Sequence, residues 1–279
     1  MQASFSELLQ EHRARGTALG AFTCYNFETA AAVLQAAQER TDSVIILISE
    51  KSFATAHGDY LVAALRAVAE RAPVPVCLQL DHISDLRRIE AAFALGVGAV
   101  MADGSRLSFE QNIAFVREAV AIAQRYGGYV EAELGRVEGD EDIATAARAG
   151  AFTDPEQAAI FVERAQPACL AVSIGNVHGV YQHPPALDWE RLKKIHEQTT
   201  APLSLHGASG LSDEDLRRAI TYGIAKINVN TELRSRYVQV AAEQAPQMAR
   251  GSRLLELQLT LTEALAQVAG AKLDVYNGR

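Results

Sequence analysis

Short β-rich runs alternate with segments of helical periodicity through most of this chain. Eight such runs are present, at residues 18–26, 43–49, 74–80, 99–105, 129–135, 169–175, 202–207 and 226–231. Several are almost continuously apolar, as is typical of parallel strands that helices cover on both faces. Eight strands that alternate with helices predict a closed parallel (β/α)8 barrel, the TIM barrel.

An open, doubly wound parallel sheet is the structural alternative. Such a sheet usually carries a glycine-rich phosphate-binding turn directly after its first strand. Here that turn is residues 24–28, with the sequence Cys-Tyr-Asn-Phe-Glu. The closed barrel is therefore favoured over the open sheet.

The length of 279 residues and the 49% share of hydrophobic residues suit one large core. We expect residues 1–279 to form one barrel domain, with the barrel itself at 18–245. Residues 251–279 follow the eighth unit without a ninth strand, and their apolar spacing predicts an amphipathic helix. Its apolar positions are Leu254, Leu257, Leu261, Leu265 and Val268. This C-terminal helix is either a cap on the barrel or an oligomer contact.

Charge and cysteine content restrict the partners and the compartment. The net charge of −8 leaves no basic excess to neutralise nucleic acid, whereas small anionic substrates stay compatible because backbone dipoles bind them locally. Cys24, Cys77 and Cys169 lie far apart in apolar runs, so we expect reduced thiols and a cytoplasmic protein. No run reaches the length of a membrane span, and residues 1–20 lack the apolar core of a secretory signal.

Three histidines fall at or just after the C-terminal ends of expected strands, namely His82, His178 and His206. A barrel brings these ends together on one face, so the three side chains are expected to meet. Three imidazoles that leave one position open form a catalytic zinc site, in which the metal acts as a Lewis acid. Any one of them alone would more often be a structural, hydrogen-bonded residue. The other four, expected on the surface or in loops, are His12, His57, His183 and His196.

Acidic residues share the same face of the expected barrel. Glu131 and Glu133 are two apart in a strand and therefore point the same way, which we expect to be inward, toward the metal or its histidines. Asp81 and Asp103 are candidates either for catalysis or for capping the helices that follow them. The connection 136–153 is longer than the others, and Asp154 and Pro155 after it predict a helix start.

Two segments rich in small residues predict a phosphate site. Residues 206–210 read His-Gly-Ala-Ser-Gly and residues 228–231 read Asn-Val-Asn-Thr. Small side chains let backbone N–H groups approach an anion closely, and barrels commonly bind phosphate at the ends of strands seven and eight.

Together these motifs resemble the class II fructose-bisphosphate and tagatose-bisphosphate aldolases. The matching segments occur in the family's order over residues 18–235, and jointly they are more specific than any one of them. They are Leu-Asp-His at 80–82, Asp-Gly-Ser at 103–105, Glu-Ala-Glu-Leu-Gly at 131–135, His-Gly-Val-Tyr at 178–181, Leu-His-Gly-Ala-Ser-Gly at 205–210 and Lys-Ile-Asn-Val-Asn-Thr at 226–231.

The resemblance implies a metal site and two catalytic acids. It implies that His82, His178 and His206 bind one catalytic Zn²⁺, and that Asp81 exchanges the proton of the C4 hydroxyl. Glu141 matches the loop glutamate that deprotonates dihydroxyacetone phosphate, a role that suits a closing lid. Two further residues match an alternative metal position or support the histidines, namely Asp103 and Glu133.

The resemblance also implies a small-molecule sugar phosphate as partner, with neither nucleic acid nor membrane. The implied substrate-binding residues are Asn26, Ser49, Gly179, Gly207, Ala208, Ser209, Asn228, Asn230 and Thr231. The resemblance implies that Asn228 binds the enediolate oxygens. It implies that the C1 phosphate and a monovalent cation bind at Gly179, Gly207–Ser209, Asn230 and Thr231, and it allows a second divalent cation. A homodimer or homotetramer is the assembly expected of the family.

Several alternatives stay open at the level of sequence. Lys226 points inward if Asn228 does, so a Schiff-base mechanism is a rival. A metal-dependent hydrolase or isomerase and a non-catalytic sugar-phosphate sensor are further rivals, the latter having no need for Asp81 and Glu141. The configuration at C4, fructose or tagatose, depends on fine placement of side chains. The C-terminal helix lacks the basic residues common in the family, so the aldehyde half, with or without phosphate, is also open.

Overall fold

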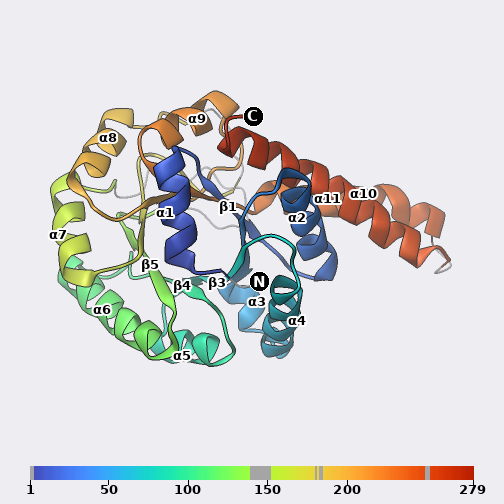
Figure 1. The fold of residues 1–279 in the computed structure, drawn as a ribbon, viewed down its shortest axis with the longest axis horizontal. Helices are drawn as coiled ribbons and strands as arrows, with labels where there is room; N and C mark the ends of the chain where they lie inside the picture. Colours follow the sequence, from blue (N-terminus) through green and yellow to red (C-terminus); the bar gives the residue numbers. More distant parts are fainter. Residues whose placement is uncertain (1–2, 139–151, 180, 182–184, 249–251) are drawn as a thin grey trace.

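The computed structural model describes residues 3–138, 152–179, 181, 185–248 and 252–279. Eight parallel strands close into a barrel in chain order, with β8 pairing back to β1 (Figure 1). The strands are β1 Leu19–Thr23, β2 Val44–Ser49, β3 Val76–Ile83, β4 Ala99–Ala102, β5 Tyr129–Leu134, β6 Cys169–Val172, β7 Leu203–Leu205 and β8 Ile224–Val229. The predicted TIM barrel is confirmed.

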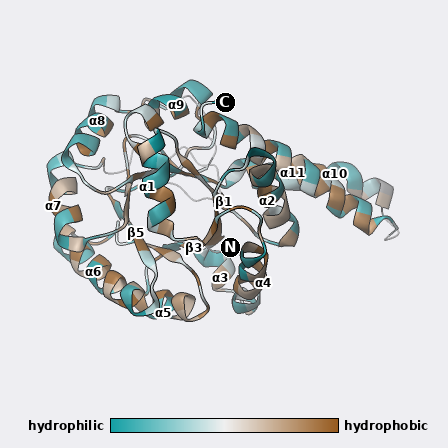
Figure 2. Cartoon of the chain, viewed as in Figure 1, coloured by the Kyte–Doolittle hydropathy of each residue, from teal (hydrophilic) through white to brown (hydrophobic). Residues whose placement is uncertain are grey.

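Helices surround the barrel and follow each strand. They are α1 Phe5–Arg15, α2 Phe27–Arg40, α3 Glu50–Phe53, α4 Gly58–Glu70, α5 Leu86–Ala94, α6 Phe109–Tyr126, α7 Pro155–Ala165, α8 Trp189–Gln198, α9 Asp213–Thr221, α10 Thr231–Gln244, the 3-10 turn η1 Ala245–Met248, and α11 Leu254–Tyr276. The helices carry both apolar and polar residues along their length (Figure 2), because one side faces the strands and the other faces solvent. The predicted start of α7 is confirmed, with Asp154 as its N-cap and Pro155 as its first residue.

Strand β3 extends further than its apolar run predicts. The predicted strand ends at residue 80, whereas β3 ends at Ile83 and therefore includes Asp81 and His82. The pairing of β3 with β4 shifts register between Leu80 and Ile83, and His82 has a φ of 55°. A left-handed backbone at a non-glycine residue is strained and is concentrated at functional sites.

Helix α1 covers the N-terminal end of the barrel. Its Phe5 and Leu9 are fully buried, together with inward-facing residues such as Leu19, Ile45 and Cys77. This packing explains the amphipathic pattern of the N-terminal segment. It closes the end of the barrel opposite the site described below, where parallel strands of a TIM barrel do not carry catalysis.

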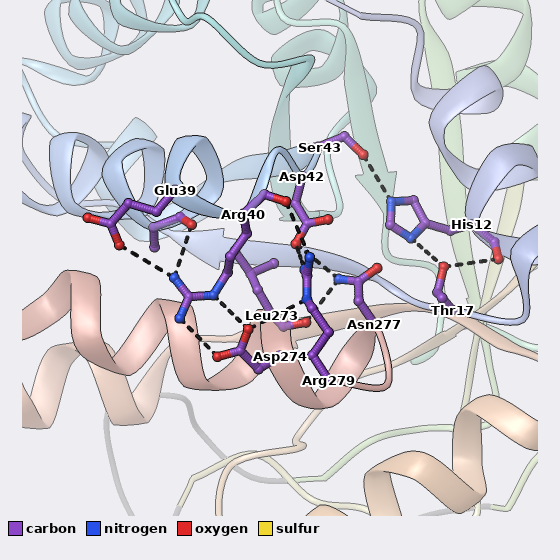
Figure 3. Close-up of polar contacts among 11 residues, drawn as sticks. His12, Thr17, Glu39, Arg40, Asp42, Ser43, Leu273, Asp274, Asn277 and Arg279 are labelled. Carbon is purple, nitrogen blue, oxygen red and sulfur yellow. Dashed lines mark hydrogen bonds and ion pairs between the residues drawn. The ribbon is translucent and has the colours of Figure 1, made fainter.

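His12 of α1 is not on the surface, which corrects the expectation from sequence. Its side chain is buried, with Nδ1 2.9 Å from Thr17 Oγ1 and Nε2 2.9 Å from Ser43 Oγ (Figure 3). Burial, with a smaller contribution from nearby Arg15, lowers the pKa of His12 to about 4. The sequence could not show this burial because α1 precedes the first strand and its docking site comes from elements far along the chain.

The C-terminal half of α11 packs on α2 and on the barrel. Leu265, Ala269 and Leu273 are fully buried there. Arg40 of α2 donates to both carboxylate oxygens of Asp274, at 2.8 and 2.9 Å, and Arg279 pairs with Asp42 (Figure 3). Of the two predicted roles for this helix, the structure shows the cap on the barrel.

The N-terminal part of α11 runs beside α10 and projects beyond the ring of helices (Figure 1). Leu254, Leu255 and Leu259 of α11 are 61–67% exposed there. Within the described residues, no helix is both long enough and apolar enough to cross a membrane. Cys24, Cys77 and Cys169 are free and buried, as the sequence predicts for reduced thiols.

Candidate active site

The three predicted histidines meet at the C-terminal end of the barrel. His82 lies near the end of β3, His206 directly follows β7, and His178 lies in the segment after β6. One ring nitrogen of each can be chosen so that all three lie within 4.8 Å of one another. His82 Nε2 and His206 Nδ1 are 3.1 Å apart, close to the spacing of two imidazole ligands with bonds of about 2.0–2.1 Å to one tetrahedral zinc.

Carboxylates hold two of these rings from behind. Asp103 Oδ2 is 2.9 Å from His82 Nδ1, and Glu131 Oε1 is 3.0 Å from His206 Nε2. Each contact occupies the ring nitrogen that faces away from the histidine cluster. Carboxylate partners of this kind orient metal-binding imidazoles and increase their basicity. The donor set and its supports therefore fit a divalent metal ion.

Burial and charge set the protonation of the three rings. Burial lowers the pKa of His178 and of His206, and the nearby histidines lower the pKa of His178 further. Burial also acts against protonation of His82, but Asp81, Asp103 and Glu133 outweigh it and raise its pKa well above the usual value. A bound metal ion would take the place of that proton, since metal binding requires neutral imidazole.

Glu131 and Glu133 both point into the barrel, as predicted. Glu131 accepts from Gln79 Nε2 at 2.6 Å and pairs with Lys226 Nζ at 2.8 Å, in a site with no exposure to solvent. Glu133 accepts from the backbone N–H of Val137 at 3.1 Å, and its buried Oε2 has no hydrogen-bond partner among the described residues. Burial, and then the charge of Asp103, raises the pKa of Glu133 to about 8. Asp103 and Glu133 stand outside the cluster of three histidines.

Asp81 is buried beside the histidine cluster. Its Oδ2 accepts from Asn228 Nδ2 at 3.2 Å, and its buried Oδ1 has no hydrogen-bond partner within the part of the chain that the structure describes. The alternative role of helix N-cap is wrong for both candidate aspartates. Asp85 caps α5, and Ser108 caps α6.

A cavity of about 660 Å³ opens onto this cluster. Of the predicted site residues, it is lined by Ser49, Asp81, His82, Asp103, Glu133 and His178. Three cations also line it, namely Lys51, Arg106 and Arg136. Arg136 pairs with Glu138, whereas Arg106 is exposed and makes no ion pair with a described residue. The lining therefore carries acidic and basic side chains together, since Glu50 and Glu138 also belong to it.

The two predicted phosphate segments lie side by side at the ends of β7 and β8. Ser209 Oγ is 3.5 Å from Glu232 Oε2 in the first turn of α10. Gly207 has a φ of 60°, and a Cβ there would lie 2.2 Å from Val177 O. Gly179 also has a positive φ, of 97°. Asn228, Asn230 and Thr231 are buried. Among the described residues, the N-cap of α10 makes no side-chain cap bond, and helix N-termini favour anions.

Two other predicted residues cap helices, and a third cannot be placed because it lies outside the described residues. Asn26 caps α2, where its Oδ1 accepts from Thr29 N at 3.0 Å and its Nδ2 donates to Tyr237 at 3.1 Å. Ser49 caps α3 while it lines the cavity. Glu141 lies outside the described residues. Glu138 O accepts from His178 N at 2.8 Å, so Glu138 contacts the histidine cluster.

The match to known proteins decides the family. Residues 3–278 match the family model described as fructose-bisphosphate aldolase class-II. The chain belongs to the class II fructose-bisphosphate aldolase family. Membership makes it a lyase of the aldolase type, in a family that generally depends on a divalent metal and acts on sugar phosphates.

Solved structures agree with the family. The YdjI aldolase from Escherichia coli K12 is 32% identical, with a TM-score of 0.86 and coverage of 99% of this chain and 97% of that chain. A provisionally named fructose-1,6-biphosphate aldolase from Coccidioides immitis is 33% identical, with a TM-score of 0.88 and coverage of 97% and 94%. The fructose-bisphosphate aldolase from Campylobacter jejuni, at 21% identity, 99% and 95% coverage and a TM-score of 0.81, shares the fold.

Sequence reasoning missed part of the polar network in this class II aldolase. Gln79 and Lys226, both fully buried, contact Glu131, and Tyr181 donates to Gly207 O at 2.7 Å. The spacing of Lys226 to Asn228 predicted that Lys226 points inward, but not that it contacts Glu131. The same spacing, two residues before Asp81, was an unused signal for Gln79. Residues two apart on a strand share a face. Gln79 therefore points into the barrel with Asp81, and Lys226 does so with Asn228.

Proposed function

We propose that this class II aldolase reversibly cleaves a ketose 1-phosphate or 1,6-bisphosphate, of fructose or tagatose type, into dihydroxyacetone phosphate and an aldehyde. The observation that carries the proposal is the cluster of His82, His178 and His206 next to the buried carboxylate of Asp81. A cation-binding cluster beside a carboxylate that faces a cavity suits carbon–carbon cleavage next to a carbonyl.

We propose Zn²⁺ as the metal, because three imidazoles with carboxylate support are a typical catalytic zinc set. When bound, the metal would supply a Lewis acid that withdraws electron density from the substrate carbonyl. His82, His178 and His206 would hold it, and Asp103 and Glu131 would keep two of the rings oriented. Lys226 is unsuited to the rival Schiff-base chemistry, since its ammonium is fully buried and donates to Glu131 and Asn228.

Asp81 is proposed as the group that takes the proton from the C4 hydroxyl in cleavage and returns it in synthesis. Its Oδ2 is held by Asn228, which leaves Oδ1 as the oxygen available to the substrate. Both Asp81 and His82 line the cavity, so a substrate hydroxyl can reach the carboxylate while the carbonyl lies near the histidines.

Glu141 is proposed as the residue that moves the proton at C3 of dihydroxyacetone phosphate. Support comes from its match to the family's loop glutamate and from the contact of Glu138 with His178, which anchors the start of that connection at the site. We further propose that the C1 phosphate binds between Gly207–Ser209 and Asn230–Thr231. The place of both segments at the ends of β7 and β8 and the N-terminus of α10 support this position.

We propose an aldehyde that carries negative charge, such as glyceraldehyde 3-phosphate. Support comes from Arg106, which lines the cavity, is exposed and makes no ion pair with a described residue, and from the hydroxyl groups of Ser49 and Ser52 in the same lining. This arrangement compensates for the few basic residues in α11. A bisphosphate is therefore the favoured substrate over a ketose 1-phosphate with a neutral end.

Chelation tests the proposed function most directly. We expect a chelator to abolish the release of dihydroxyacetone phosphate from fructose or tagatose 1,6-bisphosphate, and Zn²⁺ to restore it. The measurement is a coupled assay of dihydroxyacetone phosphate over a panel of ketose mono- and bisphosphates. Cleavage that persists in excess chelator would exclude the metal-dependent mechanism, and a panel without any cleaved substrate would exclude the aldolase proposal.

A further inference from the structure

The fully buried ammonium of Lys226 connects the two halves of the site. From β8 it reaches across the barrel to Glu131 Oε2 on β5, at 2.8 Å, and it also donates to Asn228 Oδ1 at 2.6 Å. Glu131 in turn contacts His206, and Asn228 contacts Asp81. One cation therefore lies a single side chain away from both a candidate metal ligand and the candidate acid.

An ammonium group can donate hydrogen bonds but cannot accept them. Lys226 therefore requires the amide oxygen of Asn228 to face it, and the NH₂ of Asn228 must then point toward Asp81. The side-chain amide of Asn228 could otherwise turn over with little change in shape. In this way Lys226 determines that Asp81 contacts the NH₂ group of Asn228 and not its amide oxygen.

The same reasoning applies to His206. Lys226 and Gln79 both donate to Glu131 Oε2, which leaves Oε1 to accept from His206. A neutral imidazole has one N–H and one lone pair. If Nε2 carries the hydrogen that Glu131 accepts, the lone pair is on Nδ1, and Nδ1 is the atom 3.1 Å from His82 Nε2 in the histidine cluster.

We propose that Lys226 is a positioning residue that sets the proton arrangement of the site. It holds Glu131 so that His206 presents the lone pair of Nδ1 to a metal ion, and it holds Asn228 so that Asp81 receives an N–H group. It touches neither the metal position nor the cavity. The inference rests on the proposed metal-dependent function. Its test measures the tautomer of His206 and the binding of metal, and it needs no substrate.

Glu131→Gln is the informative substitution, because a glutamine amide has one accepting and one donating end. With Lys226 present, the amide oxygen must face the ammonium and the NH₂ must face His206 Nε2. His206 then has to accept at Nε2 and carry its hydrogen on Nδ1, where a metal ion would need the lone pair. We expect zinc affinity to fall by about 100-fold, the upper end for loss of a supporting carboxylate.

Removing Lys226 as well is expected to restore part of that affinity. In Glu131→Gln/Lys226→Met the glutamine can turn its oxygen toward His206. Gln79 can turn with it, because Gln79 Oε1 has no hydrogen-bond partner among the described residues. We expect zinc to bind about 10-fold more tightly than in Glu131→Gln alone, a recovery within the range of such supporting contacts. A lysine with a merely structural role would make the double variant worse.

The experiment measures Zn²⁺ affinity by competition with a chelating dye, and the tautomer of His206 by ¹⁵N–¹H correlation of the metal-free protein. Wild-type protein should carry the hydrogen on Nε2, and Glu131→Gln should carry it on Nδ1. Lys272→Met is the matched control, since Lys272 pairs with Glu232 away from the cluster, and it should leave both readouts unchanged.

Distinct outcomes separate the two proposals. Wild-type protein that fails to bind Zn²⁺ would overturn the proposed function. Wild-type binding with Nδ1 protonated in His206, or a double variant that binds zinc no better than Glu131→Gln, would overturn the role of Lys226. If the double variant does not fold, the tautomer of His206 in wild-type and Glu131→Gln protein still tests the role of Lys226.

Discussion

Asp81 is the residue whose chemistry separates cleavage from the other steps of the proposed reaction. We expect Asp81→Asn to lower the rate of retro-aldol cleavage by about 10²- to 10⁴-fold, because general acid–base groups contribute on this scale. The amide keeps an oxygen to accept from Asn228, so the site should stay folded. The measurement is kcat for release of dihydroxyacetone phosphate.

The control for Asp81→Asn is exchange of the C3 proton of dihydroxyacetone phosphate with solvent. This half-reaction does not involve the C4 hydroxyl, so its rate and the zinc content should stay within about 10-fold of wild type. A cleavage rate equal to that of wild type would reassign the acid to another carboxylate of the cavity.

His12 gives the fold a pH dependence that is separate from the active site. Its pKa is about 4 in the folded protein, mainly through burial, against 6.5 for the ordinary group. The unfolded chain therefore binds the proton more readily, and stability is lost as the pH falls from about 6.5 to about 4. The lowered pKa corresponds to a loss of at most about 3.4 kcal/mol of stability.

Urea unfolding of wild type and His12→Gln at about pH 7 and about pH 4.5 measures this contribution. We expect the free energy of unfolding of wild type to fall more steeply between the two pH values than that of the variant. Carboxylates elsewhere titrate equally in both proteins and cancel in the comparison. Equal slopes would show that folding does not lower the pKa of His12.

At the residue scale, prediction from sequence depends on whether a side chain's neighbours lie in a known place. His82, His178 and His206 were predictable together because the barrel brings the ends of strands to one face. His12 and the capping role of Asn26 were not. Their partners depend on how one helix docks and where another begins, which the strand pattern does not determine.

The sequence predicts that α11 is a helix, but it does not predict where α11 packs. Its periodicity indicates one apolar face, and the structure divides the helix into a buried C-terminal half and a projecting N-terminal part. The division follows from α2, whose Arg40 pairs with Asp274 and against which α11 packs. Strand β3 is a second case, because its last residues are polar and a pattern of apolar residues cannot include them.

The docking of α11 should contribute strongly to stability. Leu273 is fully buried and lies against β1, where its Cδ2 would be 3.0 Å from a Cβ on Gly20. We expect Leu273→Ala to lower the free energy of unfolding by about 2–5 kcal/mol, the usual cost of a buried leucine truncated to alanine. Chemical denaturation measures it.

The matched control for this element is Ile160→Ala on α7, whose side chain is 44% exposed. Exposed truncations usually change stability by less than about 0.5 kcal/mol. If Leu273→Ala had an equally small effect, α11 would be a detachable appendage and the barrel would be stable without its cap.

At the scale of the whole molecule, the number and alternation of the apolar runs predict the fold. Eight apolar runs alternating with helices leave few topologies, because parallel strands need crossovers and these are right-handed. The closed order β1 to β8 is therefore a consequence of periodicity. The polar network inside the barrel was harder to predict from the sequence, because Lys226 on β8 contacts Glu131 on β5 only when the barrel closes.

The projecting part of α10 and α11 leads to a prediction about assembly. Val238 of α10 and Leu254, Leu255 and Leu259 of α11 are 61–67% exposed. Grouped apolar side chains on a projecting element usually mark a contact. We expect a second copy of the chain to cover them, in line with the homodimer or homotetramer that the family resemblance predicts.

Light scattering at micromolar concentration tests this assembly. We expect wild type to have at least twice the chain mass of 30.1 kDa, and Leu255→Glu/Leu259→Glu to shift toward the single-chain mass because two buried charges would oppose association. Tyr60→Glu is the control, since Tyr60 is 74% exposed on α4 and lies on another element. A monomeric wild type would show that these leucines remain in contact with water, and a double variant of unchanged mass would move the contact to a different surface.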